Sequence, residues 1–118
     1  SELSPRPHDT GMVTLGHTTN LSEFELHFRA VMGLPIAGIH LEHAGASAVI
    51  SAKEEADHDP TYNLIDALRE DYTRVRIFGK HVQHPGRRMG VVLCYGDADA
   101  PTTPLREKAK RLAATIIK

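Results

Sequence analysis

Two prolines near the start of the chain constrain its backbone more than any other feature of the sequence. Pro5 and Pro7 flank Arg6 in the segment S-P-R-P-H-D-T-G. Each proline fixes its own φ and disfavours a helical conformation in the residue before it. The segment is therefore predicted to be stiff and extended. Glu2 precedes this segment and Asp9 lies within it, so two carboxylates and one guanidinium are crowded into a short stretch.

A carboxylate at the end of a strand is suited to binding a metal ion. Glu2 stands at such a position, because the sequence predicts that the chain begins with a strand. Mg²⁺ prefers hard oxygen ligands and usually bridges to the phosphates of a substrate. We therefore predict that Glu2 is a Mg²⁺ ligand.

A helix is predicted to follow the stiff segment, over residues 20–32. Asn20 and Glu23, three residues apart, form a capping pair, and Gly33 is typical of a helix end. Apolar residues at helical spacing predict a face that packs inward. These residues are Leu21, Phe24, Phe28 and Val31.

The rest of the chain is predicted to be rich in strands. We expect strands over residues 36–42, 47–53, 73–79 and 89–95, a turn of small residues at 43–46, and a short helix over 60–70. Thr103 is the expected cap of a last helix that begins at Pro104. The inward face of this helix consists of Leu105, Ala109, Leu112, Ala113 and Ile116.

Three cations are predicted to meet at one end of the hairpin formed by the last two strands. Lys80 follows the first of these strands, and Arg87 and Arg88 precede the second. Arginine supplies forked donors and lysine a mobile point charge, a combination suited to a phosphate monoester. On these residues alone, a solvated charged loop is the other interpretation.

Composition limits the binding partners that we expect. The 14 Lys and Arg residues nearly balance the 15 Asp and Glu residues, so the net charge favours neither nucleic acid nor an anionic membrane. The sequence has no apolar run of the roughly 20 residues that a membrane span needs, and we see no signal peptide. The single Cys94 excludes an internal disulfide and, in V-V-L-C-Y, is typical of a small buried hydrophobe. We expect a cytoplasmic protein.

The opening segment resembles the last active-site strand and loop of the ATP-grasp ligases, which carry a Glu-x-Asn-x-Arg pattern. The run E-L-S-P-R keeps the Glu and the Arg, with Ser4 in place of the Asn. Within that superfamily, P-R-P-H-D-T-G-M-V-T is similar to the formate-dependent phosphoribosylglycinamide formyltransferases. The ATPase subunit of phosphoribosylaminoimidazole carboxylase more typically reads R-x-H-N-S-G-H, and Asp9 and Met12 stand where that family has Asn and His.

The resemblance extends over nearly the whole chain, through V-M-G-L-P-I, A-G-A-S-A-V-I, R-I-F-G-K and G-R-R-M-G-V-V-L. It implies an α+β fold in two parts. Residues 1–32 would be the last strand, loop and helix of an ATP-grasp domain. Residues 33–118 would be a small antiparallel β-barrel-like cap, called a rudimentary single-hybrid motif, with a C-terminal helix.

The resemblance also implies roles for individual residues. Glu2 would hold Mg²⁺, and Arg6 would act in phosphoryl transfer. Lys80, Arg87 and Arg88 fall where the family grips the 5′-phosphate and ribose of glycinamide ribonucleotide, and Asp9 falls on another residue that touches this substrate.

The implied reaction has two steps and uses ATP, formate and glycinamide ribonucleotide. ATP phosphorylates formate, and the amine of the ribonucleotide attacks the formyl phosphate. We expect the chain to be the carboxyl-terminal piece of a homodimeric enzyme, inactive by itself. Two alternatives are the carboxylase ATPase subunit and, from another class, a stand-alone module that binds a phosphate ligand or a protein without catalysis.

Overall fold

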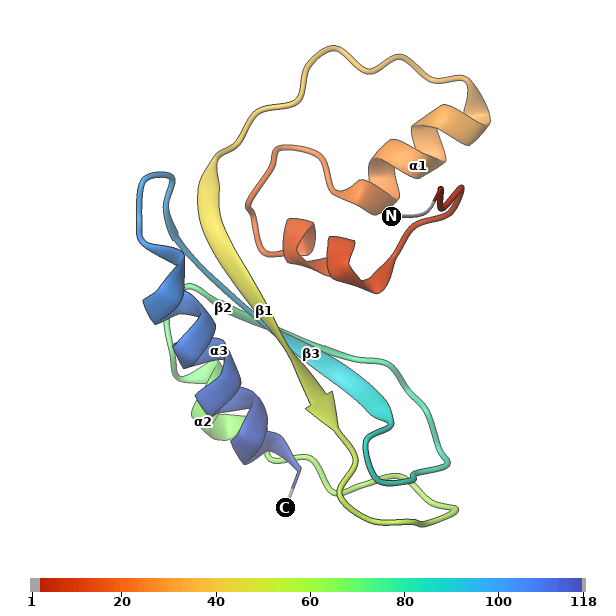
Figure 1. The fold of residues 1–118 in the computed structure, drawn as a ribbon, viewed down its shortest axis with the longest axis vertical. Coiled ribbons are helices and arrows are strands. Elements are labelled where there is room, and N and C mark those ends of the chain that lie inside the picture. Colours follow the sequence, from red (N-terminus) through yellow and green to blue (C-terminus); the bar gives the residue numbers. More distant parts are fainter. Residues whose placement is uncertain (1–2, 118) are drawn as a thin grey trace.

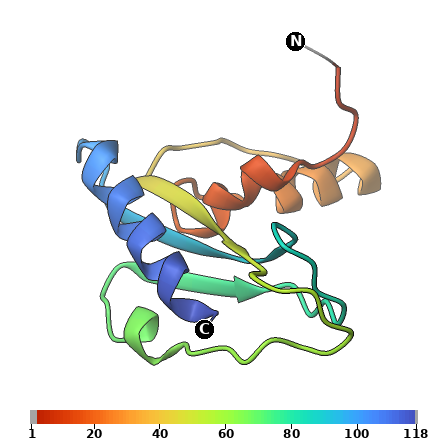
Figure 2. The same cartoon turned by 60° about the horizontal axis from the view of Figure 1, so that its bottom comes forward.

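The computed structural model describes residues 3–117 and has a three-stranded antiparallel sheet at its centre, with strand order β1-β3-β2 (Figure 1). The chain runs through η1 (Asp9–Leu15), α1 (Glu23–Met32), β1 (His43–Ser51), α2 (Ile65–Leu68), β2 (Thr73–Ile77), β3 (Arg88–Asp97) and α3 (Thr102–Ile116). Figure 2 shows the 3-10 helix η1 and the helix α2 on opposite sides of the sheet. The predicted α+β class is confirmed.

The main core lies between the sheet and α3. Ala48 and Ile50 of β1 and Val92 and Cys94 of β3 pack in one buried cluster with the inner face of α3. The predicted inward face of the last helix is confirmed, since its members are buried or packed against this cluster. Each fully buried aliphatic side chain of this kind stabilises the fold by about 1.5–3 kcal/mol.

The predicted turn at residues 43–46 is wrong, because these residues form the first part of β1. The strand pairs with β3 from its first residue onward, with Gly45 opposite Tyr95. Small side chains occur here because η1 and the turn after it lie against the sheet. A Cβ atom on Gly45 would overlap the methyl group of Thr18. In a strand interior, small residues mark such a close approach of a neighbour.

The strand predicted over residues 36–42 is also wrong. This stretch is an irregular connection that runs from α1 to β1. The side chain of Asn20 bonds to its backbone, donating to the Gly38 carbonyl at 3.0 Å and accepting from the His40 amide at 2.7 Å. These bonds satisfy backbone groups that, in a strand, would be paired with a neighbouring strand.

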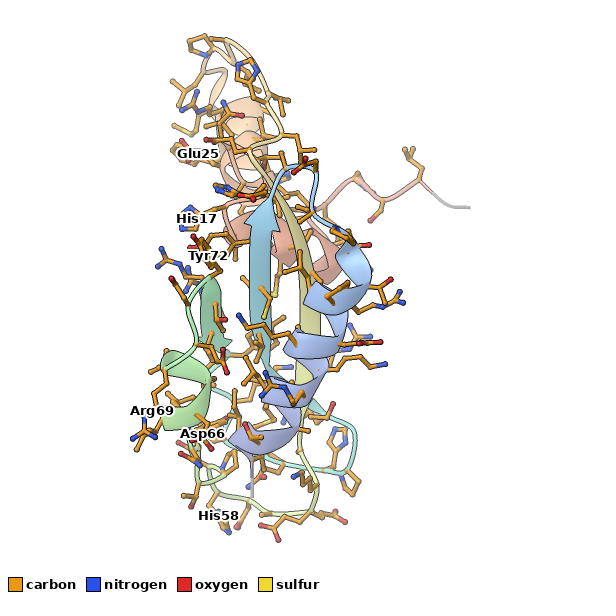
Figure 3. The ribbon with its side chains drawn as sticks, turned by 90° about the vertical axis from the view of Figure 1, so that its left-hand side faces the viewer. His17, Glu25, His58, Asp66, Arg69 and Tyr72 are labelled. Carbon is orange, nitrogen blue, oxygen red and sulfur yellow. The ribbon has the colours of Figure 1, made fainter. Side chains whose placement is uncertain are left out.

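The capping residue of α1 is Ser22 rather than the predicted Asn20, and its hydroxyl accepts the Glu25 amide at 3.1 Å. The predicted inward face of this helix is wrong, since none of its side chains is buried. Figure 3 shows α1 at one end of the molecule. Exposed large apolar side chains continue from α1 into the connection, and we call them the apolar face. Its members are Phe28, Val31, Met32, Leu34, Ile36, Ile39 and Leu41.

The helix predicted over residues 60–70 shortens to the single turn of α2. The residues just before it are tied to the end of α3: Tyr62 forms a bridge with Ile117, and the Asn63 amide donates to the Ile116 carbonyl at 2.7 Å. These bonds hold the chain extended where a longer helix would begin.

The other expected elements need smaller changes. The last two strands are confirmed as β2 and β3, although β3 begins earlier, at Arg88. The helix α3 also begins earlier than predicted. Pro101 occupies its cap position without a side-chain hydrogen bond, so the predicted cap at Thr103 is wrong. No helix in the described residues is long and apolar enough to span a membrane.

An aromatic cluster joins the turn after η1 to the sheet. The Tyr95 ring makes edge contacts with the rings of His17, His43 and Tyr72, with centroids 5.2–5.4 Å apart. His17 and Tyr72 have φ of 62° and 57°, an uncommon conformation for residues other than glycine. The guanidinium of Arg74 donates to Nε2 of His17 at 2.7 Å. This cluster fixes the turn against the edge of the sheet.

Cys94 is buried, as predicted, and forms part of the main core. Burial raises the pKa of its thiol, and the Thr73 hydroxyl and two nearby cations oppose this shift only in part. A thiol with a raised pKa stays protonated at neutral pH and is a poor nucleophile. Cys94 is a packing residue.

The packing of β3 predicts different effects of an alanine substitution at two of its glycines. An ideal Cβ on Gly90 would lie 2.5 Å from the Arg76 carbonyl oxygen, whereas one on Gly96 would meet nothing closer than 3.5 Å. We expect Gly90→Ala to lower the free energy of unfolding by about 1–3 kcal/mol, because β2 must move away. Gly96→Ala should change it by less than about 0.5 kcal/mol. Urea unfolding of both variants measures the difference, and equal stabilities would contradict this packing.

Candidate functional site

The structure brings Asp9 and Arg88 together on one face of the sheet. The carboxylate of Asp9, in the first turn of η1, forms an ion pair with the guanidinium of Arg88, the first residue of β3. Both side chains line a pocket of about 180 Å³ whose walls include Met12, Val49 and Phe78. A paired carboxylate and guanidinium above an apolar wall can hold a small ligand that carries both a polar group and an anion.

A β-bulge turns Arg88 toward this pocket. Val49 pairs with Val91 and Ile50 with Gly90, but Ser51 pairs with Arg88, so Met89 is one extra residue in β3. In a regular strand the side chain of residue 88 would point to the same face as residues 90 and 92, which is the α3 core. The bulge places Met89 in that core instead and turns Arg88 to the η1 face.

His8 holds the start of η1 beside Asp9. Its Nδ1 lies 2.8 Å from the Asp9 carboxylate and 3.2 Å from the Thr10 amide nitrogen. A protonated ring pairs with Asp9, and a neutral ring accepts the Thr10 amide and caps the helix. In both states the ring contacts the residue that meets Arg88.

The other two predicted cations lie around the same hairpin end with different contacts. The Arg87 guanidinium donates to the Val82 carbonyl at 2.6 Å and so closes the loop between β2 and β3. The Lys80 ammonium lies 5.5 Å from the centre of the Phe78 ring, a cation–π contact. Phe78 lines the pocket, so Lys80 lies near its edge. That these cations bind one phosphate stays a prediction.

Arg6 lies outside this pocket. Its side chain is exposed and lines a separate, open groove together with Glu23 and His27 of α1. No strand is assigned to residues 3–8. Glu2 lies outside the described residues. Within residues 3–117, no group of three or more His, Cys, Asp or Glu side chains is arranged to hold a metal ion.

The sequence reasoning missed two features of the site. One is the bulge at Met89, because R-R-M-G-V-V reads as the start of an uninterrupted strand; Gly90 next to it was the available signal. The other is Glu23, interpreted as the capping partner of Asn20. Its carboxylate instead accepts the backbone amide of His8 at 2.8 Å.

The three-stranded sheet with its helices is the fold of a carboxyl-terminal module of ATP-grasp enzymes. The sequence model of one family, described as "PurT, C-terminal", matches residues 45–116. The chain therefore belongs to the PurT family, the formate-dependent phosphoribosylglycinamide formyltransferases.

Relatives with this name are similar over nearly all of the chain. The protein from Bacteroides thetaiotaomicron is 55% identical over 117 residues, and the one from Syntrophotalea carbinolica 49% identical over 119. These alignments cover 98% and 100% of this chain but 30% of each relative. The chain thus spans less than a third of the length of these relatives.

A solved structure has the same fold. N5-carboxyaminoimidazole ribonucleotide synthetase from Thermotoga maritima superposes with a TM-score of 0.78 and 26% identity, over 97% of this chain and 31% of that one.

The exposure of the Asp9–Arg88 pair predicts that it contributes little to stability. The side chains are 33% and 60% exposed, and exposed pairs typically contribute about 0–1 kcal/mol. We expect Asp9→Asn to lower the free energy of unfolding by less than about 1 kcal/mol, as measured in urea. Asp59→Asn, which breaks the exposed pair with His81, is the matched control. A loss above about 2 kcal/mol would show that Asp9 is mainly a structural residue.

Proposed function

We propose that this chain is the substrate-holding part of an enzyme that formylates glycinamide ribonucleotide with formate and ATP. In the first step the γ-phosphoryl group of ATP passes to formate, giving formyl phosphate and ADP. In the second step the substrate amine attacks the formyl carbon and phosphate leaves. The observation that carries the proposal is the meeting of Asp9 and Arg88, both expected substrate residues, in one pocket.

The role of this pocket is to hold the ribonucleotide while the amine reacts. Arg88 would bind the 5′-phosphate, and Lys80 and Arg87 lie around the same hairpin end to add charge. Asp9 would then exchange its contact with Arg88 for one with the substrate. Anchoring the phosphate far from the reacting amine supplies orientation, which lowers the entropic part of the barrier.

Phosphoryl transfer requires cations to stabilise the charge that spreads over the transferred group. Arg6 is exposed beside α1 and would supply one such charge. Mg²⁺, with Glu2 as one ligand, is part of the proposal through the family alone. A single carboxylate is an incomplete Mg²⁺ site, so the other ligands would come from ATP and from the rest of the enzyme.

The apolar face on α1 and the following connection supports a place in a longer protein. Its seven large side chains are 41–69% exposed, and contiguous exposed apolar patches mark interaction sites. The relatives are more than three times as long as this chain. We propose that residues 1–32 end the ATP-grasp domain, that residues 33–118 form the cap, that the cap closes into a barrel-like unit with its neighbours, and that the whole enzyme is a cytoplasmic homodimer.

The carboxylase ATPase subunit, the nearest alternative from the sequence, belongs to a different family from the one that matches this chain. The similarity in fold to N5-carboxyaminoimidazole ribonucleotide synthetase is compatible with it. The formyltransferase is favoured because Asp9, where the alternative typically has Asn, supplies the charge that pairs with Arg88. An asparagine there would hold this guanidinium without neutralising it.

Removing Arg88 from the full-length enzyme tests the proposed substrate pocket. We expect Arg88→Ala to raise the KM for glycinamide ribonucleotide about 10–100-fold, the loss of one charge-assisted contact of about 1.5–3 kcal/mol. The KM for ATP should change little. Arg106→Ala, which removes an exposed arginine of α3 in a different groove, is the matched control. An unchanged KM for the ribonucleotide would contradict the assignment of Arg88.

The chain by itself should not catalyse the reaction. ATP would be bound by the part of the enzyme that corresponds to the portion of the relatives that this chain does not match. We expect no ADP release above the blank when the 118-residue chain is mixed with ATP, formate and glycinamide ribonucleotide in a coupled assay. Turnover above the blank would contradict the proposal that ATP is bound by the rest of the enzyme.

A further inference from the structure

Glu23, the first residue of α1, connects this helix to the segment that carries Arg6 and Asp9. One oxygen of its carboxylate accepts the backbone amide of His8 at 2.8 Å. His8 lies between the two functional residues and next to Asp9. We infer that Glu23 is a positioning residue that sets the approach of Asp9 to Arg88. The inference rests on the proposed function and extends it to a residue without a role in that proposal.

Gly11 leaves the space that the Glu23 carboxylate occupies. It is buried, and a methyl group on it would overlap this carboxylate. Its backbone does not require glycine, because the positive-φ glycines of the described residues are Gly33, Gly79 and Gly86. Gly11 is therefore a glycine for close packing. The helix η1 and the Glu23 carboxylate are thus in close contact at Gly11.

Thr14 fixes the backbone of Glu23 at the same place. The Glu23 amide donates to the Thr14 hydroxyl at 2.9 Å, and this hydroxyl donates to the Gly11 carbonyl at 2.6 Å. Glu23 thus bonds to the cap of η1 with its side chain and to the last turn of η1 with its backbone. Both ends of the short helix that begins with Asp9 are tied to one residue.

The bonds of Glu23 and Thr14 to η1 matter because the ion pair between Asp9 and Arg88 is weak. Asp9 and Arg88 are partly exposed, and an exposed pair does not by itself hold a loop in one place. The position of Asp9 is therefore decided by the backbone of η1, which Glu23 and Thr14 fix. Small displacements of a binding group can change rates and affinities strongly.

Three substitutions of Glu23 in the full-length enzyme test the inference. We expect Glu23→Ala to raise the KM for glycinamide ribonucleotide about tenfold, because Asp9 loses its fixed position. Glu23→Gln keeps the length and an acceptor for the His8 amide, so its KM should stay within about threefold of wild type. Glu23→Asp keeps the charge but is one methylene shorter, and its KM should resemble that of the alanine variant.

Glu25→Ala is the matched control, because it removes a carboxylate from the same turn of α1. The partner of this carboxylate is Arg29. It should leave the KM at the wild-type value. A purely structural role of Glu23 would lower the melting temperature in all three variants without separating Gln from Asp in KM. Equal KM values for these two variants, or a KM of wild-type size in Glu23→Ala, would overturn the inference.

The pairing of Glu23 with Gly11 gives a second measurement. Gly11→Ala should raise the KM at least as much as Glu23→Ala, and its additional effect in the Glu23→Ala background should be much smaller, because the space is then free. Independent, multiplicative effects would overturn the inference. A wild-type enzyme that does not formylate glycinamide ribonucleotide would instead contradict the proposed function, which keeps the two failures distinct.

Discussion

The central strand β3 determines how the rest of this structure is arranged. It pairs with both other strands, and its residues are buried on both faces, with Val92 and Cys94 toward α3 and Val91 and Leu93 toward η1. Such a strand has no freedom to slip, because a shift of one residue would exchange its two faces. The one extra residue at Met89 therefore has a definite result, which is that Arg88 faces η1.

The main core of this molecule and its candidate site lie on opposite faces of the sheet. The packing between the sheet and α3 consists of aliphatic side chains and a buried thiol without catalytic character. The polar contacts of the candidate site lie on the other face and are partly exposed. A site of this kind depends on how well its loops are held, and here short backbone segments are fixed by single side chains such as Asn20, Glu23 and Arg87.

The sequence was sufficient to predict the structure where one kind of interaction decides which residues are buried. The apolar face of α3 and the burial of Cys94 follow from patterning. The opening segment led to Asp9 as a candidate, and the cations at the end of the last hairpin led to Arg88. The sequence was misleading where a distant neighbour decides. The small residues at 43–46 read as a turn because nothing local shows that Thr18 lies against Gly45. The apolar stripe of α1 read as core because its spacing does not say what covers it.

The aromatic cluster gives this chain a spectroscopic reporter of its own. The chain has three tyrosines and no tryptophan. Tyr95 is in edge contact with Tyr72, His17 and His43, whereas Tyr62 lies at the far end of α3. Near-ultraviolet circular dichroism is sensitive to such fixed ring contacts. The signal thus reports, without any label, whether the segment before α1 is seated on the sheet, even while the α3 core stays intact.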